Sequence, residues 1–434
     1  MIRSFTIEDF KSYKKAELKL APLTVMVGAN ASGKSNALEA IRFLSWMAQG
    51  SKLSALQFEI NQSNAGIRGH IRNIFFAGAN DFTIKCSMLD TERKDSWRIS
   101  LTVESRQQKE FHIKHEYMYS EKDECLYETT APTTELATDI NVQYKKFRQG
   151  KKPSTICSDQ LPIFTQMSID GKINPIYKQS NQTISFLSKR TESMLSRILF
   201  LDPSPQSMRN YSFPSENKLV GNGENISAVL YNLISNNPDN KQKILDFIQS
   251  LPEQDIADIG FLIGPRMEVM VALIETFGGV SRTMDAGTLS DGTLRVLAIA
   301  GALLSAPQNS IVIIEEIDNG VHPSRAKQLL NQINAIALER KLTVLISTHN
   351  PALMDALPDE VIPDVVFCYR DREDGSSKLI SLKDVPNYPE LISQGSLGDL
   401  VTQNALSSFV KNYRGPEMRK SAALEWLNSI KTGL

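Results

Sequence analysis

The sequence predicts an α/β protein with a mixed, mostly parallel sheet that carries an antiparallel β subdomain and a helical subdomain as inserts. Three observations lead to this fold class. A short apolar strand at 23–27 runs into a glycine-containing loop and a helix from residue 36, and strand–helix alternation returns after residue 289. Between these segments, short alternating runs at about 50–190 predict antiparallel strands, and 190–275 is predicted to be helical.

The amino-terminal part is expected to begin with strands. Residues 2–10 and 16–20 alternate between apolar and polar side chains, as half-buried strands do. The helix predicted at 36–47 carries an apolar residue at every third position, which gives it one buried face. Runs at 81–88 and 97–103 alternate again and predict antiparallel strands at the start of the insert.

The α/β pattern returns in the carboxy-terminal half. We expect a helix at 291–305, a strand at 310–315, a helix at about 323–339 and a strand at 342–347. A hairpin at 364–382 follows, because a cluster of turn residues separates two short strands there. Strands that alternate with helices in this way typically build a parallel sheet.

Composition indicates a globular protein without a membrane span. The chain has 434 residues, of which 41% are hydrophobic and 22% charged, and its formal net charge is −1. Any contact with nucleic acid must therefore come from a local basic patch. The four cysteines form no CxxC pair, and the most apolar stretch, 294–304, is too short to cross a bilayer. We expect a cytoplasmic protein without a zinc site or disulfides.

The segment Gly28–Ser35 matches the pattern GxxxxGK[ST] and lies between a predicted strand and a predicted helix, as a phosphate-binding loop requires. Its glycines allow backbone N–H groups to point at phosphates, and the helix N-terminus adds a favourable dipole. Lys34 can neutralise the β- and γ-phosphates, and Ser35 can ligate magnesium. The residues expected to hold the nucleotide here are Gly28, Asn30, Ala31, Ser32, Gly33, Lys34, Ser35 and Asn36.

Four apolar residues followed by two carboxylates occupy 311–316, which is the pattern of a Walker B strand. Glu315 can hold the magnesium shell, and Glu316 can polarise the attacking water. Most strands of this kind carry aspartate at the first carboxylate, so Glu315 leaves the metal geometry open. The alternative interpretation is a core strand that ends in solvated acids.

Two further motifs lie on either side of this strand. Leu289–Thr293 opens a helix and matches an LSxG signature, in which Ser290 is the N-cap and Gly292 completes the motif. His349 follows the strand at 342–347, where a histidine can contact the γ-phosphate. Taken alone, Ser290 would be an ordinary helix cap and His349 a polar surface residue. The order of the four motifs favours the functional interpretation.

Together these motifs resemble those of the RecF/SMC-like branch of ABC ATPases, in particular the stand-alone bacterial predicted ATPases of the AAA-15/OLD-like and AAA-21 type. The segments that carry the resemblance are Phe10–Tyr13, Asp202–Pro205, Met208–Arg209, Gly223–Asn225, Glu316–Pro323, Ser347–Pro351 and Gln394–Asp399. The resemblance covers most of the chain except about 100–185.

The resemblance implies an ABC-type P-loop ATPase head that uses ATP and magnesium. Glu316, His349 and Lys34 would be its catalytic residues, and Ser35 and Glu315 its metal ligands.

It also implies a head-to-tail homodimer. Ser290 and Gly292 would face the γ-phosphate bound to the other subunit, and Asp318 would begin the D-loop that crosses the dimer interface. Lys11 and Ser12 would lie near the nucleotide; a strand end at the surface is the alternative for these two residues.

Five parts are expected along the chain. They are a first ATPase lobe with Walker A at 1–100, a β-rich insert at 101–190, a helical subdomain at 191–285, an ATPase lobe with the signature, Walker B, D-loop and switch histidine at 286–385, and carboxy-terminal helices at 386–434. The insert lacks the long heptad repeats of SMC arms, so the protein is not expected to reach distant DNA.

Some features depart from the family pattern. The sequence has no convincing Q-loop glutamine, and Gln57 and Gln62 are only unanchored candidates. Too few residues follow His349 for a TOPRIM nuclease plus closing helices, and the acids at 371–374 fall in a hairpin turn, so any nuclease would be a separate chain. The run at 144–152 is basic and aromatic. It could contact nucleic acid, but we favour a solvated hairpin whose charge the acids at 121–124 balance.

Three functions remain in view. We favour an ATP-gated dimeric switch in antiphage defence or DNA maintenance, which licenses or restrains a separately encoded effector, as the resemblance implies. The second is a RecF-like DNA-binding ATPase that acts without an effector, with DNA left open as a partner. The third is the ATPase subunit of a membrane transporter. The long insert and the missing Q-loop argue against it, and no membrane contact is expected.

Overall fold

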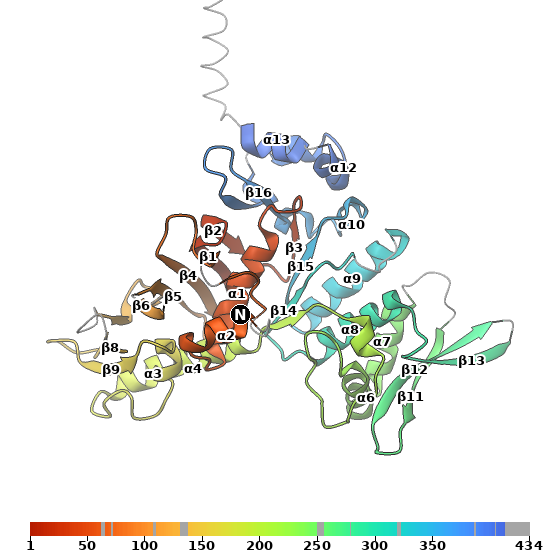
Figure 1. The fold of residues 1–434 in the computed structure, drawn as a ribbon, viewed down its shortest axis with the longest axis horizontal. Coiled ribbons are helices and arrows are strands. Elements are labelled where there is room, and N and C mark those ends of the chain that lie inside the picture. The colour runs from red at the N-terminus through yellow and green to blue at the C-terminus, as the bar shows by residue number, and fades with distance from the viewer. Residues whose placement is uncertain are drawn as a thin grey trace, which may run out of the picture.

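The computed structural model describes residues 1–61, 66–70, 73–106, 110–130, 138–249, 256–277, 279–318, 323–385, 388–403 and 405–412. These residues build a six-stranded sheet, an eight-stranded sheet and a three-stranded sheet. The six-stranded sheet lies between the other two (Figure 1).

The central sheet is mixed and mostly parallel, as the sequence predicted. Its strand order is β10 (Leu199–Leu201), β14 (Ile311–Ile314), β15 (Thr343–Thr348), β3 (Leu23–Val27), β16 (Val366–Arg370) and β17 (Ser377–Ser381). Every neighbouring pair is parallel except β16 and β17, which form the expected hairpin. The parallel strands therefore end at the same edge of the sheet.

Helices cover both faces of the central sheet. The odd-numbered residues of β14 share a core with α1 (Lys34–Ala48), and the even-numbered residues share a core with α8 (Asp291–Ser305) and α9 (Pro323–Glu339). A parallel strand that is buried on both faces must be apolar throughout, which is why β14 was recognisable in the sequence. The helix and strand bounds expected between 291 and 348 are confirmed to within one residue.

The eight-stranded sheet is antiparallel and includes the amino-terminal strands. Its order is β2 (Tyr13–Lys19), β1 (Ile2–Phe10), β4 (Asp81–Asp90), β5 (Asp95–Ser105), β6 (Phe111–Ser120), β7 (Cys125–Thr129), β8 (Asp139–Tyr144) and β9 (Ser154–Ser158). The expected strand at 16–20 begins three residues earlier. The boundary placed at residue 100 falls inside β5, because the insert extends a sheet that β1 and β2 begin.

Short helices join this sheet to the central one. They are η1 (Leu53–Ala55), α2 (Leu56–Asn61), α3 (Ile163–Met167) and α4 (Lys178–Ser196). α4 packs against both α1 and α3. The core on this side is continuous from α1 through β1, β4 and β5 to α4, so the antiparallel sheet is part of the support of the phosphate-loop helix.

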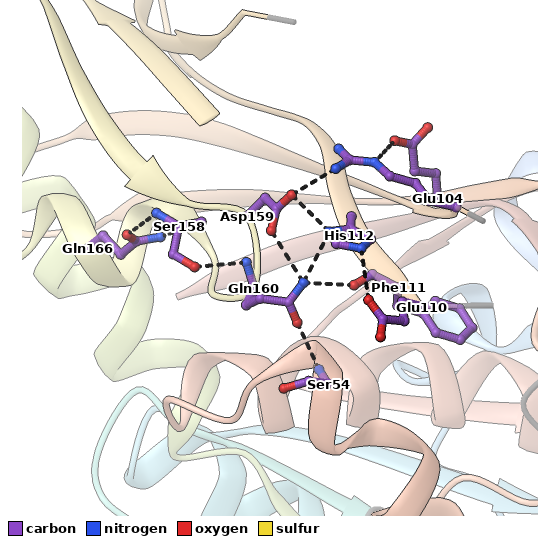
Figure 2. Close-up of polar contacts among 10 residues, drawn as sticks. Ser54, Glu104, Glu110, Phe111, His112, Ser158, Asp159, Gln160 and Gln166 are labelled. Atoms are coloured by element: carbon purple, nitrogen blue, oxygen red, sulfur yellow. Dashed lines mark hydrogen bonds and ion pairs between the residues drawn. The ribbon is translucent and has the colours of Figure 1, made fainter. Parts of the chain in front are cut away.

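A buried polar cluster adds a second connection between the antiparallel sheet and α1 (Figure 2). The Asp159 carboxylate is fully buried and accepts hydrogen bonds from Arg106 Nη1 at 3.1 Å and His112 Nδ1 at 2.9 Å. Gln160 Nε2 donates to the same carboxylate at 3.3 Å, and Gln160 Oε1 accepts the N–H of Ser54 at 2.9 Å. Ser54 lies in η1, shortly after α1, so the cluster fixes the chain where the phosphate-loop helix ends.

The segment expected to be helical from 190 to 275 is only partly so. It contains α5 (Pro205–Met208), α6 (Ile226–Asn236) and α7 (Asp239–Ile248), and then the antiparallel sheet of β11 (Ile256–Ile263), β12 (Val269–Phe277) and β13 (Val280–Asp285). The helical prediction is therefore wrong at 199–201, which form β10 of the central sheet, and again from residue 256 onward. A short continuous apolar run such as β12 has no period that distinguishes a strand from a buried helix.

The carboxy-terminal part contains several short elements. They are α10 (Pro351–Asp355), η4 (Ile362–Asp364), η5 (Leu382–Asp384), α11 (Tyr388–Ile392), α12 (Leu397–Thr402) and α13 (Ala405–Asn412). The rest of the helices expected at 386–434 lies outside the described residues. Among the residues that the structure describes, no helix is long and apolar enough to cross a membrane.

Candidate functional site

Three loops that are far apart in the sequence meet at the carboxyl edge of the central sheet. They follow β3, β14 and β15, which are neighbours in the order β14-β15-β3. Between them lies a cavity of about 360 Å³. It is lined by Ala29, Asn30, Ala31, Ser32, Gly33, Lys34, Ser35, Asn36, Arg68, Glu315, Glu316, Ser347, Thr348, His349 and Arg370. Most residues expected to hold the nucleotide and the metal thus line one space, at the position where α/β sheets commonly bind ligands.

The backbone of the phosphate loop requires its glycines. Gly28 and Gly33 have φ angles of 155° and 120°, and Ala31 adopts a left-handed φ of 62°. A Cβ atom on Gly33 would lie 2.3 Å from the hydroxyl oxygen of Ser377 in β17, so a side chain does not fit there. α1 starts at Lys34 without a side-chain cap. The first turn of α1 therefore offers backbone N–H groups and the positive end of the helix dipole to an anion.

Lys34 lies along the loop that it follows. Its Nζ donates hydrogen bonds to the carbonyl oxygens of Gly28 at 2.6 Å and Ala29 at 3.2 Å. Burial lowers the pKa of Lys34, while the charges of Cys368, Asp318 and Glu316 act in the opposite direction. The ammonium group thus lies between the loop and the acids that follow β14, where it can neutralise terminal phosphate groups.

Glu315 forms part of the wall between two cavities. It lines the phosphate-loop cavity and also a neighbouring cavity of about 590 Å³, which Arg42 and Asp202 line as well. Burial raises the pKa of Glu315, and the Arg42 guanidinium lowers it through an ion pair of 2.8 Å. Ser35 and Glu315 present hydroxyl and carboxylate oxygens in the same cavity, and magnesium prefers such hard oxygen ligands.

Glu316 adopts an unusual backbone conformation. Its φ is 47°, in the left-handed region that non-glycine residues seldom occupy, and its side chain is exposed at the cavity. The Glu316 N–H donates to the Ser347 hydroxyl at 3.1 Å, and the Ile317 N–H donates to the Ser347 carbonyl at 3.3 Å. Backbone strain of this kind concentrates at functional sites, where the surrounding structure maintains it.

His349 is oriented by Asp318. The His349 Nδ1 lies 3.2 Å from the Asp318 carboxylate, whose side chain is only 6% exposed, whereas that of His349 is 47% exposed. A carboxylate at Nδ1 favours the tautomer with the proton on that nitrogen. Nε2 is then the nitrogen available to a ligand in the cavity. Residues 319–322, the rest of the expected D-loop, lie outside the described residues.

The signature residues do not line this cavity. Ser290 is exposed and caps α8, accepting a hydrogen bond from the Thr293 N–H at 3.1 Å. Arg209 braces the motif by donating to the Leu289 carbonyl at 3.0 Å and to the Asp291 carboxylate at 2.7 Å. Gly292, in the first turn of α8, is likewise absent from the cavity lining. Ser290 therefore has the helix-cap role that the sequence predicts. It does not line the cavity that the phosphate loop of its own chain forms.

Lys11 and Ser12 lie behind the cavity and do not line it. Lys11 forms an ion pair with Glu39 of α1 and donates to the Arg68 carbonyl at 2.8 Å. The Ser12 hydroxyl accepts hydrogen bonds from Asn36 Nδ2 at 2.8 Å and Ser377 Oγ at 2.7 Å. Both residues thus support the loop and α1 from the antiparallel sheet.

Four polar residues at or next to the cavity were missed in the sequence. Arg68 and Arg370 line it, Ser347 holds Glu316, and Arg42 holds Glu315. Only Ser347 had a sequence signal, since it opens the motif that contains His349. The arginines come from segments without a motif, so only folding brings them to the site.

The other sites considered in the sequence do not form a binding centre. In the basic run, Tyr144 is buried, Lys145 forms an ion pair with Glu124, and Lys152 lies 2.7 Å from Glu128. These contacts balance the charge of two of the five basic residues in the run, so the choice between a solvated hairpin and a nucleic-acid contact stays open. At 371–374, two of the carboxylates accept backbone N–H groups of their own turn. In the described part of the chain, no group of three potential metal ligands occurs.

Comparison with known proteins identifies the fold and the family. The profile of a family described as "AAA domain, putative AbiEii toxin, Type IV TA system" matches residues 23–355, from the first residue of β3 to the end of α10. The chain belongs to this family. The match includes the phosphate loop, the Walker B strand and the switch histidine.

Several known proteins are similar to this chain in sequence or in fold. An ATP/GTP phosphatase of Helicobacter pylori is 24% identical over 405 residues, which cover 89% of this chain and 94% of the relative. RecF of Gloeobacter violaceus, a DNA replication and repair protein, is 50% identical over 44 residues, which cover 10% of this chain and 12% of RecF. A solved SMC head, bound to the C-winged helix domain of ScpA, superimposes with a TM-score of 0.50 at 14% identity, covering 87% of this chain and 96% of that head. This AAA-domain chain thus has an ABC-type ATPase fold similar to that of an SMC head.

Proposed function

We propose that this protein is an ATP-driven dimeric switch. It binds ATP and magnesium in the phosphate-loop cavity, closes head to tail with a second copy, hydrolyses ATP slowly in the cytoplasm, and thereby licenses or restrains a separate effector. The observation that carries the proposal is the position of Ser290. The phosphate loop, Walker B and His349 meet in one cavity, while the signature residue lies exposed on α8 outside it.

Each residue at the cavity has a distinct proposed role. Lys34 and the first turn of α1 hold the terminal phosphates. Ser35 and Glu315 hold magnesium, which would neutralise charge on the phosphate oxygens when bound. Glu316 orients the attacking water and accepts its proton, and His349 Nε2 contacts the γ-phosphate.

The signature acts in the partner subunit. In a closed two-fold dimer, Ser290 and the first turn of α8 from one chain would cap the γ-phosphate held by the other chain. Asp318 contributes from within the same chain by fixing His349 at 3.2 Å.

The effector role rests on the family description and on one relative. The family description mentions a toxin and a type IV TA system, and the relative from Helicobacter pylori is named as a phosphatase of ATP and GTP. These descriptions support nucleotide hydrolysis coupled to a defence function. We assign the effector activity, nuclease-like in our proposal, to a separate chain.

DNA binding without an effector is the second candidate. The short match to RecF supports it. In the basic run at 144–152, Lys145 and Lys152 are engaged in ion pairs and so are less available to DNA, whereas Arg148 and Lys151 are exposed. Salt-dependent binding of duplex DNA by the purified chain would favour this alternative.

Complementation between two inactive variants tests the shared site. Ser290→Arg should by its bulk prevent closure of the site that receives the arginine, and Glu316→Gln should bind ATP without turnover; rescue requires that the damaged site does not hold the other site open. In a mixed dimer, one site combines the intact Glu316 of the first chain with the intact Ser290 of the second, while the other site collects both changes. Mixing equal amounts should restore at most roughly a quarter of the wild-type ATPase rate, since half of randomly formed dimers are mixed and each has one intact site.

The matched control is the double variant Ser290→Arg/Glu316→Gln mixed with wild type. Each of its mixed dimers has one change in each site, so activity should fall below simple dilution. If the single variants restore nothing and the control follows dilution, the chain works as independent monomers and the shared-site proposal is wrong.

A further inference from the structure

We infer that Arg42 is a positioning residue for the metal site: it holds one carboxylate oxygen of Glu315 so that the other oxygen faces the phosphate-loop cavity. This inference rests on the proposed function, because it assigns Glu315 as a magnesium ligand. It also explains how a glutamate can serve where most Walker B strands have aspartate.

The geometry of the ion pair is one-sided. Arg42 Nη2 donates to Glu315 Oε1 at 2.8 Å, with the two side chains 25% and 24% exposed. The second oxygen, Oε2, receives no hydrogen bond from the residues that the structure describes. Glu315 lines both cavities, whereas Arg42 lines only the one away from the nucleotide. Arg42 therefore approaches the carboxylate from the rear and leaves its other side available to a cation.

Arg42 is itself held in place on two further sides. Its guanidinium carbon lies 4.4 Å from the centroid of the Phe200 ring, which is a cation–π contact with the middle residue of β10. Gly66 packs against its aliphatic part so closely that a Cβ atom there would lie 2.4 Å from Arg42 Cδ. A side chain confined in this way can fix the conformation of its partner.

The longer side chain of Glu315 needs such an anchor. Compared with aspartate, glutamate has one additional rotatable bond, and its conformational freedom must be lost when it binds metal. Arg42 removes part of that freedom before the metal arrives. Arg42 also lies seven residues after Ser35, two turns along the same face of α1, so one helix would position both proposed metal ligands.

The test measures metal binding directly, together with nucleotide binding. Mn²⁺ affinity is determined by electron paramagnetic resonance in the presence of ATPγS, and ATPγS affinity is determined separately in EDTA. Arg42→Met should weaken Mn²⁺ binding roughly 10- to 100-fold, as loss of a residue that orients a metal ligand typically does. ATPγS affinity in EDTA should stay within about twofold, since Arg42 does not line the nucleotide cavity. Arg42→Lys should restore part of the Mn²⁺ affinity, because it keeps the charge.

Two controls test whether Arg42 acts on metal binding through Glu315. Arg340→Met removes a half-buried arginine that donates to the Ala306 carbonyl at 2.8 Å, away from the site, and should leave Mn²⁺ binding unchanged. In a Glu315→Asp background the shorter carboxylate no longer reaches Arg42, so adding Arg42→Met should change Mn²⁺ affinity by less than about twofold.

The outcomes separate this inference from the proposed function. Unchanged or tighter Mn²⁺ binding by Arg42→Met overturns the role of Arg42 while leaving the ATPase proposal intact. The role of Arg42 is also overturned if Arg42→Met lowers Mn²⁺ affinity by the same factor in the Glu315→Asp background as in the wild type. Arg42 would then act through a group other than Glu315. If the wild-type protein itself binds no ATPγS, the proposed function is wrong and the inference falls with it.

Discussion

At the scale of single residues, the site depends on side chains that are fixed by other side chains. Ser347 holds the strained backbone of Glu316, Asp318 fixes His349, and Arg42 fixes Glu315. Lys34 differs from these residues, since it lies against the carbonyl groups of its own loop. Lys34 lines the cavity itself, so its ammonium group can exchange these carbonyl contacts for a phosphate.

Lys34→Ala should strongly weaken nucleotide binding. A charge-assisted hydrogen bond to phosphate is worth roughly 1.5–3 kcal/mol, so ATP affinity should fall about 10- to 100-fold or more. Isothermal titration with ATPγS checks this. Lys189→Ala is the matched control, because Lys189 is an exposed residue of α4 that pairs with Asp170 at 3.2 Å. ATP affinity within twofold of wild type in Lys34→Ala would refute the assignment of the phosphate loop.

At the scale of elements, the antiparallel sheet holds α3 through a buried carboxyl group. Glu116 of β6 is fully buried and accepts hydrogen bonds from the N–H groups of Ile163 at 2.6 Å and Phe164 at 2.8 Å, the first residues of α3. The Tyr127 hydroxyl donates to it at 2.7 Å. Burial raises the pKa of Glu116 to about 7, against the lowering effect of these hydrogen bonds.

This raised pKa predicts a pH-dependent stability. Between about pH 4.5 and 7 the folded protein holds a proton on Glu116 that the unfolded chain has lost, so the free energy of unfolding falls as pH rises through this window. The contribution of Glu116 to the free energy of unfolding is of the order of 3 kcal/mol, and it is fully present only below about pH 4.5. Glu116→Gln cannot titrate, so the difference in stability between wild type and variant should shrink with rising pH. Urea unfolding at pH 5, 6 and 7 measures it, and a constant difference would contradict the prediction.

At the scale of the whole molecule, the proposed function requires a change in oligomeric state. Glu316→Gln keeps the shape of the site but removes the carboxylate that orients water, so ATP should bind and remain. The variant should then accumulate as a closed dimer. Light scattering after gel filtration should give twice the mass of one chain with ATP and the mass of one chain without it. In the double variant Lys34→Ala/Glu316→Gln, the mass should remain that of one chain even with ATP. A single mass under all conditions would count against the head-to-tail dimer.

The sequence by itself determined the features that depend on residues close to one another in the chain. The phosphate loop, the apolar strand β14, the helix cap at Ser290 and the position of His349 after β15 could be predicted because each depends on a few adjacent residues with a defined backbone geometry. The parallel core followed from strands that are apolar throughout, and the helices at 291–305 and 323–339 from their periodicity and neighbours.

Tertiary structure alone decided the rest, because those features depend on residues that are distant in the sequence. The strands at 256–285 were mistaken for helix, since the choice is made by pairing between strands and not by a local period. The antiparallel sheet proved to start at residue 2, because β1 pairs with β4 across more than seventy intervening residues. Arg42 reaches Glu315 across 273 positions, and no local pattern in the sequence can indicate an ion pair that only the packing of α1 against β14 creates.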